Sequence, residues 1–251
     1  MSFLGLIIGA GAVWFVLSSG GILHLLFNLN AAILVFGGVF GAILITYPWN
    51  YIKKIPKAIF LIFFPKRLLN TAGIVTTFEN LSKRMHREGV SNALLEEVPV
   101  ADNFFKKAVR LLIDGFDKDF IEKTLKNEIK YFKERHEATC DMFKTMGAYA
   151  PIFGLLGTLI GVVQVLQNLT DPQSMGASMA IAITTTFYGI FSTNFLFLPI
   201  AGKLTAQTQQ EVLLKEIVLE GTLGLKDGDV PRVLREKLNS FIAEYESKRK
   251  R

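Results

Sequence analysis

The chain has 251 residues, half of them hydrophobic and 20% charged, with a formal net charge of +6. Soluble domains rarely have this composition, so the chain as a whole is not an ordinary water-soluble domain. The charges are unevenly placed: no Lys, Arg, Asp or Glu precedes Lys53, and only Asp171 interrupts the uncharged residues 145–202. The uncharged blocks are typical of a membrane, and the charged blocks 53–144 and 203–251 are typical of segments in water.

The uncharged blocks contain four stretches close to the length of roughly 20 residues that a membrane-spanning helix needs. The connections 20–29 and 170–175 are short, which predicts two hairpins. The first stretch has no basic n-region and no clear cleavage site, so it is not a cleaved signal peptide. We therefore predict an all-α integral membrane protein with four transmembrane helices, at about 3–19, 30–47, 147–169 and 176–200.

The basic residues predict the orientation. All 28 Lys and Arg lie in the two charged blocks, and none lies in a hairpin tip. By the positive-inside rule, both termini and the large loop face the cytoplasm. A nucleic-acid surface is the competing and much less favoured explanation of the net charge. The single Cys140 lies in a cytoplasmic segment, so no disulfide is implied.

The segment IPKAIFLIFFPK, residues 55–66, is apolar but too short to span a membrane. We predict a helix in the cytoplasmic interface with basic side chains toward lipid headgroups, and the alternative is a buried helix of the cytoplasmic domain. The basic side chains are Lys53, Lys54, Lys57, Lys66 and Arg67.

The cytoplasmic segments show helical patterns. Residues 68–115 predict short helices, the first of which stops at Gly89. Asp117 can cap a helix that nothing stops before Gly147, so this helix continues into the third membrane helix. The fourth is expected to continue beyond Pro199 into 203–220, until Gly221 and the turn LKDGDVPR at 225–232, before a last amphipathic helix. The predicted organisation is 1–52 (first hairpin), 53–67 (interfacial helix), 68–146 (cytoplasmic helical domain), 147–202 (second hairpin) and 203–251 (cytoplasmic tail).

No set of residues indicates an enzyme. His24, His86 and His136 have no metal-like spacing with the lone cysteine, and there is no phosphate-binding loop or nucleophile elbow. The four membrane stretches also lack the carboxylate, His or Lys that ion pathways usually need. If the protein moves ions, the titrating group must therefore come from another chain.

The membrane stretches instead offer small and hydroxyl-bearing residues. Gly154, Thr158 and Gly161 share one helix face with Gly157 beside it, and the fourth stretch has Ala182, Thr186, Gly189 and Thr193 at similar spacing. Small residues allow helices to approach closely, and packing within the chain explains part of the pattern. A threonine can bond its own i−4 carbonyl, or it can face a shared space and replace the water shell of an ion. Spacing does not separate these alternatives.

At these residues the chain resembles a known family. The segments MGAYAPIFGLLGTLIGVVQVLQNLTDP and SMAIAITTTFYGIFSTNFLFLPIAGKL closely resemble the third and fourth membrane helices of the MotA/PomA flagellar stator subunits. The flanking segments 111–147 and 216–238 are similar to that family too. The resemblance covers essentially the whole chain.

The resemblance implies an ion-conducting stator subunit of the bacterial inner membrane. Such subunits form a homopentamer around two copies of a MotB/PomB partner, which supplies a membrane aspartate, and they turn the rotor protein FliG. No cofactor is implied, because Na⁺ or H⁺ is transported, with sodium favoured. The implied roles are ion pathway for Thr158, Thr185 and Thr186, conformational coupling for Pro151 and Pro199, and helix close-packing for Gly154, Gly157, Gly161 and Gly189.

The rotor-facing motif departs from the family pattern. The family has an Arg three residues before a Gly and a Glu five after it, whereas Gly89 here has His86 and Leu94 at those places. The resemblance then implies rotor contact through Arg84 or Arg87 and through Glu96 or Glu97. A solvated helix face explains these charges about as well.

Three other functions stay open from the sequence, and one of them is a purely structural membrane scaffold, in which Thr158→Ala would change assembly but never motility. A TolQ/ExbB-like energiser shares the APxxGLLGT core, but it usually has three membrane helices and an outside N-terminus, and lacks the second N-terminal helix. A self-contained channel would conduct without a partner, and the absence of a membrane carboxylate argues against proton coupling by this chain alone.

Overall fold

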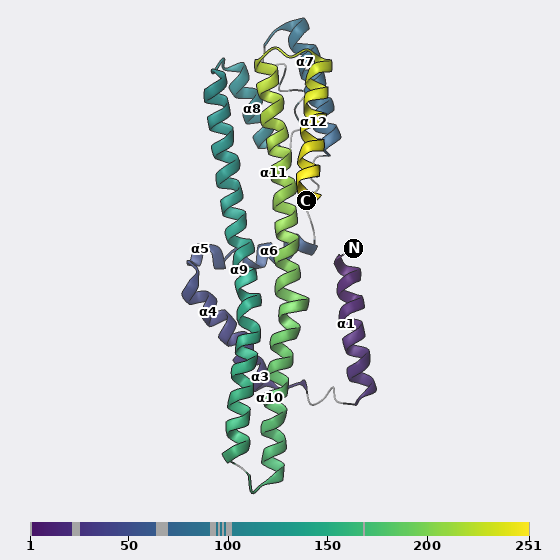
Figure 1. Cartoon of the computed structure of the whole chain (residues 1–251). Coiled ribbons are helices and arrows are strands. Elements are labelled where there is room, and N and C mark those ends of the chain that lie inside the picture. The colour runs from purple at the N-terminus through teal and green to yellow at the C-terminus, as the bar shows by residue number, and fades with distance from the viewer. Residues whose placement is uncertain are drawn as a thin grey trace. The chain divides into compact units, whose positions relative to one another are not determined.

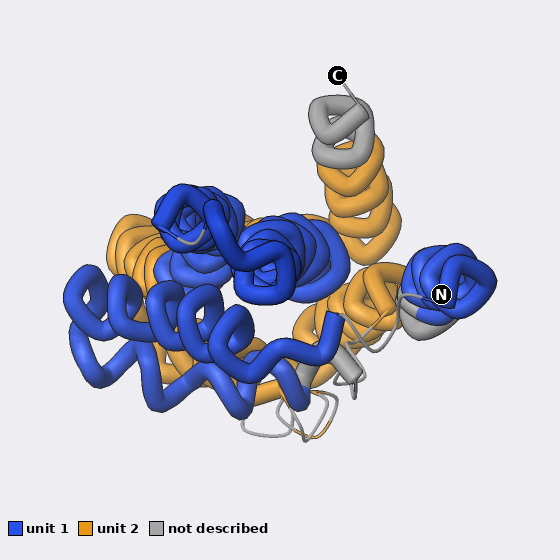
Figure 2. The backbone as a smooth tube through the Cα atoms, turned by 90° about the horizontal axis from the view of Figure 1, so that it is seen from below, with its two compact units in different colours: residues 1–65, 136–205 blue, residues 66–135, 206–251 orange. Residues whose placement is uncertain are grey.

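The computed structural model describes residues 2–21, 26–63, 70–90, 94, 96, 98, 102–167 and 169–250 (Figure 1). Every regular element in this part of the chain is a helix. Two compact units are present, and each combines segments far apart in the sequence (Figure 2). Unit 1 comprises residues 1–65 and 136–205, and unit 2 comprises residues 66–135 and 206–251.

Unit 1 begins with a series of apolar helices. The Asn28 side chain caps α3 by accepting a hydrogen bond from the Ala31 N–H at 3.1 Å, as expected of an N-cap asparagine. The π-helical segment η1 then continues this helix directly into α4. The elements are α1 (Ser2–Ser19), α3 (Leu29–Ala32), η1 (Ile33–Gly37), α4 (Gly38–Thr46), α5 (Trp49–Ile52) and α6 (Ile55–Phe63).

The longest helix is α9, Lys118–Gln167, which contributes to both units. Its first turn is capped by Asp117, whose Oδ1 accepts from the Phe120 N–H at 2.7 Å. The predicted continuous helix from Asp117 through Gly147 is confirmed. After it come α10 (Pro172–Ser192), the π-helical segment η3 (Thr193–Phe197) and α11 (Leu198–Lys226).

Three helices in the described part of the chain are long and apolar enough to cross a membrane. They are Leu29–Thr46, Lys118–Gln167 and Pro172–Lys226, and each contains a suitable apolar window. The first predicted span forms α1, but its apolar stretch Ile7–Ser19 is shorter than the other three. The protein is thus an all-helical membrane protein.

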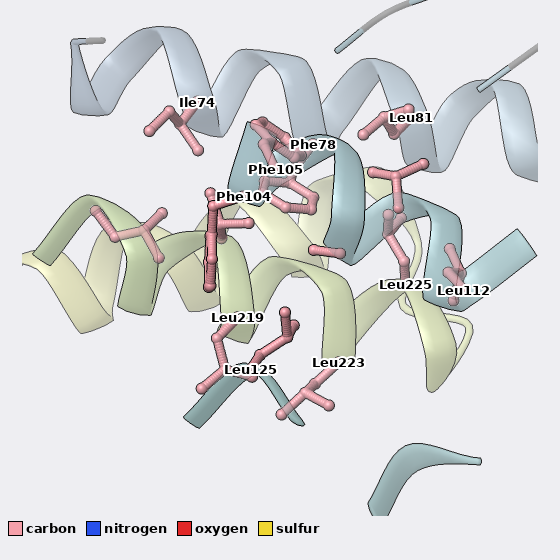
Figure 3. Packing of buried hydrophobic residues seen from close by; sticks show 14 of the residues in the cluster. Ile74, Phe78, Leu81, Phe104, Phe105, Leu112, Leu125, Leu219, Leu223 and Leu225 are labelled. Carbon is pink, nitrogen blue, oxygen red and sulfur yellow. The ribbon is translucent and has the colours of Figure 1, made fainter. Parts of the chain in front are cut away.

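Unit 2 has a core of large apolar side chains (Figure 3). It is built from α7 (Thr71–Glu88), α8 (Asn103–Ile113), α12 (Pro231–Lys250) and the unit 2 parts of α9 and α11. Phe78 and Phe105 are fully buried and stack at 4.7 Å between ring centroids. Gly89 ends α7 with a φ of 78°, which confirms the predicted stop.

The predicted end of the fourth membrane helix is wrong. Gly221 does not stop α11, which runs to Lys226, whereas the predicted turn LKDGDVPR is confirmed and uses Gly228 with a φ of 79°. Gly221 instead lies against Phe78, and a Cβ there would come within 2.6 Å of the ring. This glycine is therefore explained by close packing on a large aromatic side chain and not by a helix end.

Candidate functional site

The contact between α9 and α10 is made by glycines. A Cβ added to Gly154 would lie 2.9 Å from the Thr185 carbonyl oxygen, and one added to Gly189 would lie 2.6 Å from the Ala150 carbonyl oxygen. A Cβ on Gly161 would lie 2.6 Å from Ala182 Cβ. Because backbone atoms cannot move aside cheaply, a side chain at these positions would force the two helices apart.

Gly157 belongs to the same contact but faces a side chain. A Cβ there would collide with the side chain of Thr185. All four glycines assigned to close packing from the sequence thus lie against the other helix of their own hairpin.

Two threonine hydroxyls meet at this contact. Thr158 Oγ1 lies 3.2 Å from both the Gly154 and the Ala182 carbonyl oxygens, and it also hydrogen-bonds Thr186 Oγ1. Thr186 Oγ1 lies 3.3 Å from the Ala182 oxygen and 3.5 Å from the Gly154 oxygen. We call Thr158 Oγ1, Thr186 Oγ1 and the carbonyl oxygens of Gly154 and Ala182 the oxygen cluster. Both alternatives left open for Thr158 are therefore present: it bonds its own i−4 carbonyl and also shares a polar site with α10.

Thr185 differs from its two neighbours. Its side chain is fully buried, and its Oγ1 donates to the Ala182 carbonyl oxygen at 2.9 Å. Thr158 and Thr186 are only partly buried. In this chain, Thr185 fills the space beneath Gly157, whereas the other two threonines retain some accessible surface as residues. All-oxygen groups of this kind can replace the water shell of a cation.

The glycines of the first hairpin are used in another way. Gly9 and Gly38 receive aromatic rings: a Cβ on Gly9 would lie 2.5 Å from a Phe195 ring carbon, and one on Gly38 would collide with the Phe153 ring. The spacing Gly5-x-x-x-Gly9 does not form a paired contact, because nothing lies within 4 Å of a Cβ on Gly5. The same holds for Gly41, which has the same spacing from Gly37.

The two prolines interrupt helical hydrogen bonding. Pro151 lies inside α9 and has no N–H for the carbonyl of Gly147, its i−4 residue. Pro199 is the second residue of α11, which begins directly after η3. A π-helical turn is one of the known ways in which a helix accommodates such a break.

Thr193 is the residue in this region whose role the spacing alone did not predict. Its buried Oγ1 donates to the Gly147 carbonyl oxygen at 3.0 Å and lies 2.9 Å from the Gly189 carbonyl oxygen. Gly147 is the residue whose helical donor is missing because of Pro151. The signal available in the sequence was a threonine on the small-residue stripe, but its acceptor on α9 depends on the register between the two helices.

The proposed rotor-contact residues lie in unit 2. Arg84 Nε lies 3.1 Å from Glu88 Oε2, and Arg84 Nη2 lies 3.3 Å from Glu96 Oε2. The hydrogen bond with Glu88 is the largest cause of a raised pKa for the Arg84 guanidinium. Arg87 is exposed, and Glu97 lies outside the described residues.

The structure also explains the departure at Leu94. Leu94 is 1% exposed and belongs to the core of unit 2. It occupies the place where the family pattern has a glutamate, so that place is not at the surface of this protein. The exposed carboxylate that follows Gly89 within the described residues is Glu96, and it is tied to Arg84.

Among the described residues, no group of three or more His, Cys, Asp or Glu side chains is placed to hold a metal ion. The acidic residue nearest the second hairpin's tip, Asp171, caps α10 by accepting from the Gln173 N–H at 3.1 Å. The polar chemistry found between α9 and α10 is thus that of hydroxyl and carbonyl oxygens.

Comparisons with known proteins agree with this architecture. Residues 96–217 match the model of the MotA/TolQ/ExbB proton channel family. The chain is 35% identical to motility protein A of Borreliella burgdorferi over 88% of this chain and 84% of that protein. It is also 35% identical to the uncharacterized protein YtxD of Bacillus subtilis, over 87% of this chain and 80% of that protein.

A solved structure is similar over nearly the whole chain. The flagellar MotAB stator complex from Bacillus subtilis matches with a TM-score of 0.83 and 30% identity, covering 94% of this chain and 93% of that one. The oxygen cluster and the glycine contact thus lie in a chain that shares both fold and sequence with such proteins. The protein belongs to the MotA/TolQ/ExbB proton channel family, with motility protein A among its relatives.

Proposed function

We propose that this chain is the ion-channel subunit of a bacterial flagellar stator, which couples cation flow to torque together with a MotB/PomB-type partner. The observation that carries the proposal is the oxygen cluster at the α9–α10 contact. It offers two hydroxyls and two carbonyls to a cation in a hairpin whose only charged residue, Asp171, caps a helix. Such a subunit transports ions and is not an enzyme.

The missing titratable group supports a second chain in the pathway. Residues 145–202 contain no carboxylate other than Asp171. Intramembrane ion transfer usually needs an ionisable group, and the partner's membrane aspartate would supply it. In this proposal a homopentamer surrounds two copies of the partner, and the exposed leucine, isoleucine and valine side chains of α9 face neighbouring chains or lipid. These side chains are Ile152, Leu155, Leu156, Leu159, Ile160, Val162, Val163 and Leu166.

The proposed topology has four spans in two hairpins and both termini in the cytoplasm of the inner membrane. The absence of Lys and Arg from the hairpin tips supports this orientation. Segments 68–146 and 203–251 then form the cytoplasmic domain, in which Arg84, Arg87, Glu96 and Glu97 contact FliG. Because Arg84 already pairs with Glu88 and Glu96, rotor contact at this residue would compete with an internal pair.

We propose that α6 lies in the membrane interface, because one side of the helix is buried and apolar and the other side is exposed. Ala58 is buried with the apolar cluster of unit 1, and Ile55 and Ile59 pack against that cluster. Lys57 and Phe60 are exposed on the other side, and the exposed Trp49 lies nearby in the sequence on α5. Lysine and tryptophan side chains are typical of the border between lipid headgroups and the hydrocarbon core.

The test is motility in a host that lacks stators. The chain would be co-expressed with a MotB-like partner, and swimming speed recorded against sodium concentration at fixed proton motive force. Speed that follows sodium and collapses in both Thr158→Ala and Thr186→Ala would support a sodium path through the oxygen cluster. Speed indifferent to sodium would assign the ion as a proton.

A matched control is available in the first hairpin. Thr46 also bonds its own i−4 carbonyl, that of Ala42 at 2.7 Å, but it belongs to α4. Thr46→Ala should leave swimming unchanged. Absence of motility with every flagellar partner, despite normal membrane insertion, would contradict the stator proposal and favour a TolQ/ExbB-like energiser.

A further inference from the structure

Pro151 leaves a carbonyl of α9 without its helical donor. In a regular helix the N–H of residue 151 would bond the carbonyl of residue 147, and proline has no such N–H. The Thr193 hydroxyl, which lies in η3, donates to that carbonyl oxygen at 3.0 Å. One hydroxyl of the second membrane hairpin thus supplies the hydrogen bond that a proline withholds on the other helix.

The same place is a close contact. A Cβ on Gly147 would lie 3.0 Å from Leu198 Cδ2, so the end of η3 packs directly on Gly147. Leu198 is followed by Pro199, the second helix-interrupting proline. The two prolines are therefore connected through a single short chain of contacts: Gly147, the Thr193 hydroxyl and the π-helical segment.

The hydroxyl has two acceptors but only one proton. Besides the Gly147 oxygen, Thr193 Oγ1 lies 2.9 Å from the oxygen of Gly189, its own i−4 residue. Rotation about the Cβ–Oγ bond moves the proton from one acceptor to the other without moving the side chain. In one state the hydroxyl links η3 to α9, and in the other it bonds within its own helix and releases α9.

We infer that Thr193 is a positioning residue that couples the proline of α9 to the π-helical segment before Pro199, through a hydroxyl that can bond either helix. The inference rests on the proposed function, since a movement of these helices has a purpose only if ion flow drives it. It assigns to Thr193 the transmission of that movement and not contact with the ion.

The first experiment is a double-mutant cycle on the purified full chain with its partner in detergent. Thr193→Val removes the hydroxyl and keeps the shape, and Pro151→Ala gives Gly147 back its helical N–H donor. In the parent chain, Thr193→Val should lower the folded-to-unfolded ratio by about 3-fold, as for an average hydrogen bond between membrane helices. In the Pro151→Ala chain it should have little effect. An equal loss in both backgrounds would overturn the inference.

The second experiment distinguishes coupling from folding. Stators would be added one at a time to single motors in cells, and the speed gained per stator measured for the parent chain, Thr193→Val and Thr193→Ser. A purely structural role would reduce the number of stators that assemble but not the speed that each adds. We expect a smaller increment for valine and recovery with serine, and an unchanged increment for valine would overturn the inference.

The two proposals fail separately. If the parent chain drives no motor, the stator function fails, while the cycle still decides whether Thr193 and Pro151 are coupled. If the parent chain drives a motor and the cycle is additive, only the role of Thr193 fails. Thr46→Val is the control for loss of a threonine hydroxyl that bonds a single carbonyl of its own helix.

Discussion

The α9–α10 contact of unit 1 and the core of unit 2 are packed by opposite means. In unit 1, α9 and α10 approach closely at Gly154, Gly161 and Gly189, which have no side chain. Threonine hydroxyls then bond backbone oxygens across the contact. In unit 2, helices meet through large side chains such as Phe78 and Phe105, which are fully buried. The same chain thus uses the absence of side chains at one helix contact and large side chains in the core of the other unit.

The difference follows from the solvent that each unit faces. In water, burying apolar area stabilises by roughly 25 cal/mol per Å², so large side chains make the best core. In a bilayer the lipid is as apolar as leucine, and this driving force between helices is absent. Close van der Waals contact and interhelical hydrogen bonds remain, and both need small residues at the interface.

Truncating a large buried side chain in unit 2 should cause the largest loss of folding stability. Phe105→Ala should destabilise the protein by about 4 kcal/mol, because a fully buried phenylalanine is replaced by a cavity. Unfolding of the purified protein followed by circular dichroism would measure the loss. Phe116→Ala is the control, since Phe116 is 40% exposed, and it should cost less than about 1 kcal/mol. Similar losses for the two variants would contradict a tightly packed core in unit 2.

Adding a methyl group should destabilise unit 1 at a glycine of the α9–α10 contact but not at a glycine outside it. Gly189→Ala should destabilise by about 2 kcal/mol, because the new Cβ lies 2.6 Å from a backbone oxygen of α9. Gly176→Ala on the same helix meets nothing within 4 Å, and it should instead stabilise slightly through helix propensity. Thermal unfolding in detergent compares the two. Equal shifts in Tm would show that α9 and α10 are not in backbone contact at Gly189.

Loss of single hydroxyls should give the smallest effects. Ser82→Ala removes a 2.8 Å hydrogen bond to the Asp229 carbonyl oxygen in unit 2 and should cost about 1 kcal/mol. Thr185→Val removes a 2.9 Å bond to the Ala182 oxygen within α10 of unit 1, and it should cost about 0.5 kcal/mol, the low end for a hydrogen bond. Denaturant titration of each variant provides both values. A cost for Thr185→Val above that of Ser82→Ala would contradict the view that a hydroxyl bond within a single membrane helix adds little stability.

Much of the helical architecture was predictable from local patterns. Asp117 and Gly89 mark helix ends because capping and positive-φ geometry depend on one or two neighbouring residues. Gly221 was misjudged because a glycine can either end a helix or make room for a neighbour. The presence of Phe78 beside it is a contact between residues far apart in the sequence.

The candidate site shows the same limit. The small and hydroxyl-bearing faces of 154–161 and 182–193 were visible as spacing. Whether Thr158 bonded its own helix or faced the other helix was not, because one helical repeat serves both arrangements. The burial of Thr185 and of Leu94, and the acceptor of Thr193, depend on which residues the second helix brings opposite.

The sequence by itself determined the membrane character and the helical class, because hydropathy and charge act residue by residue along the chain. It also predicted that, if the chain moves ions, the ionisable group comes from a partner, since residues 145–202 offer only the capping Asp171. Only the tertiary structure decided that Thr158 and Thr186 share one oxygen cluster and that Thr193 serves the carbonyl left by Pro151. Both depend on the register of α9 against α10, which the pattern within one helix does not specify.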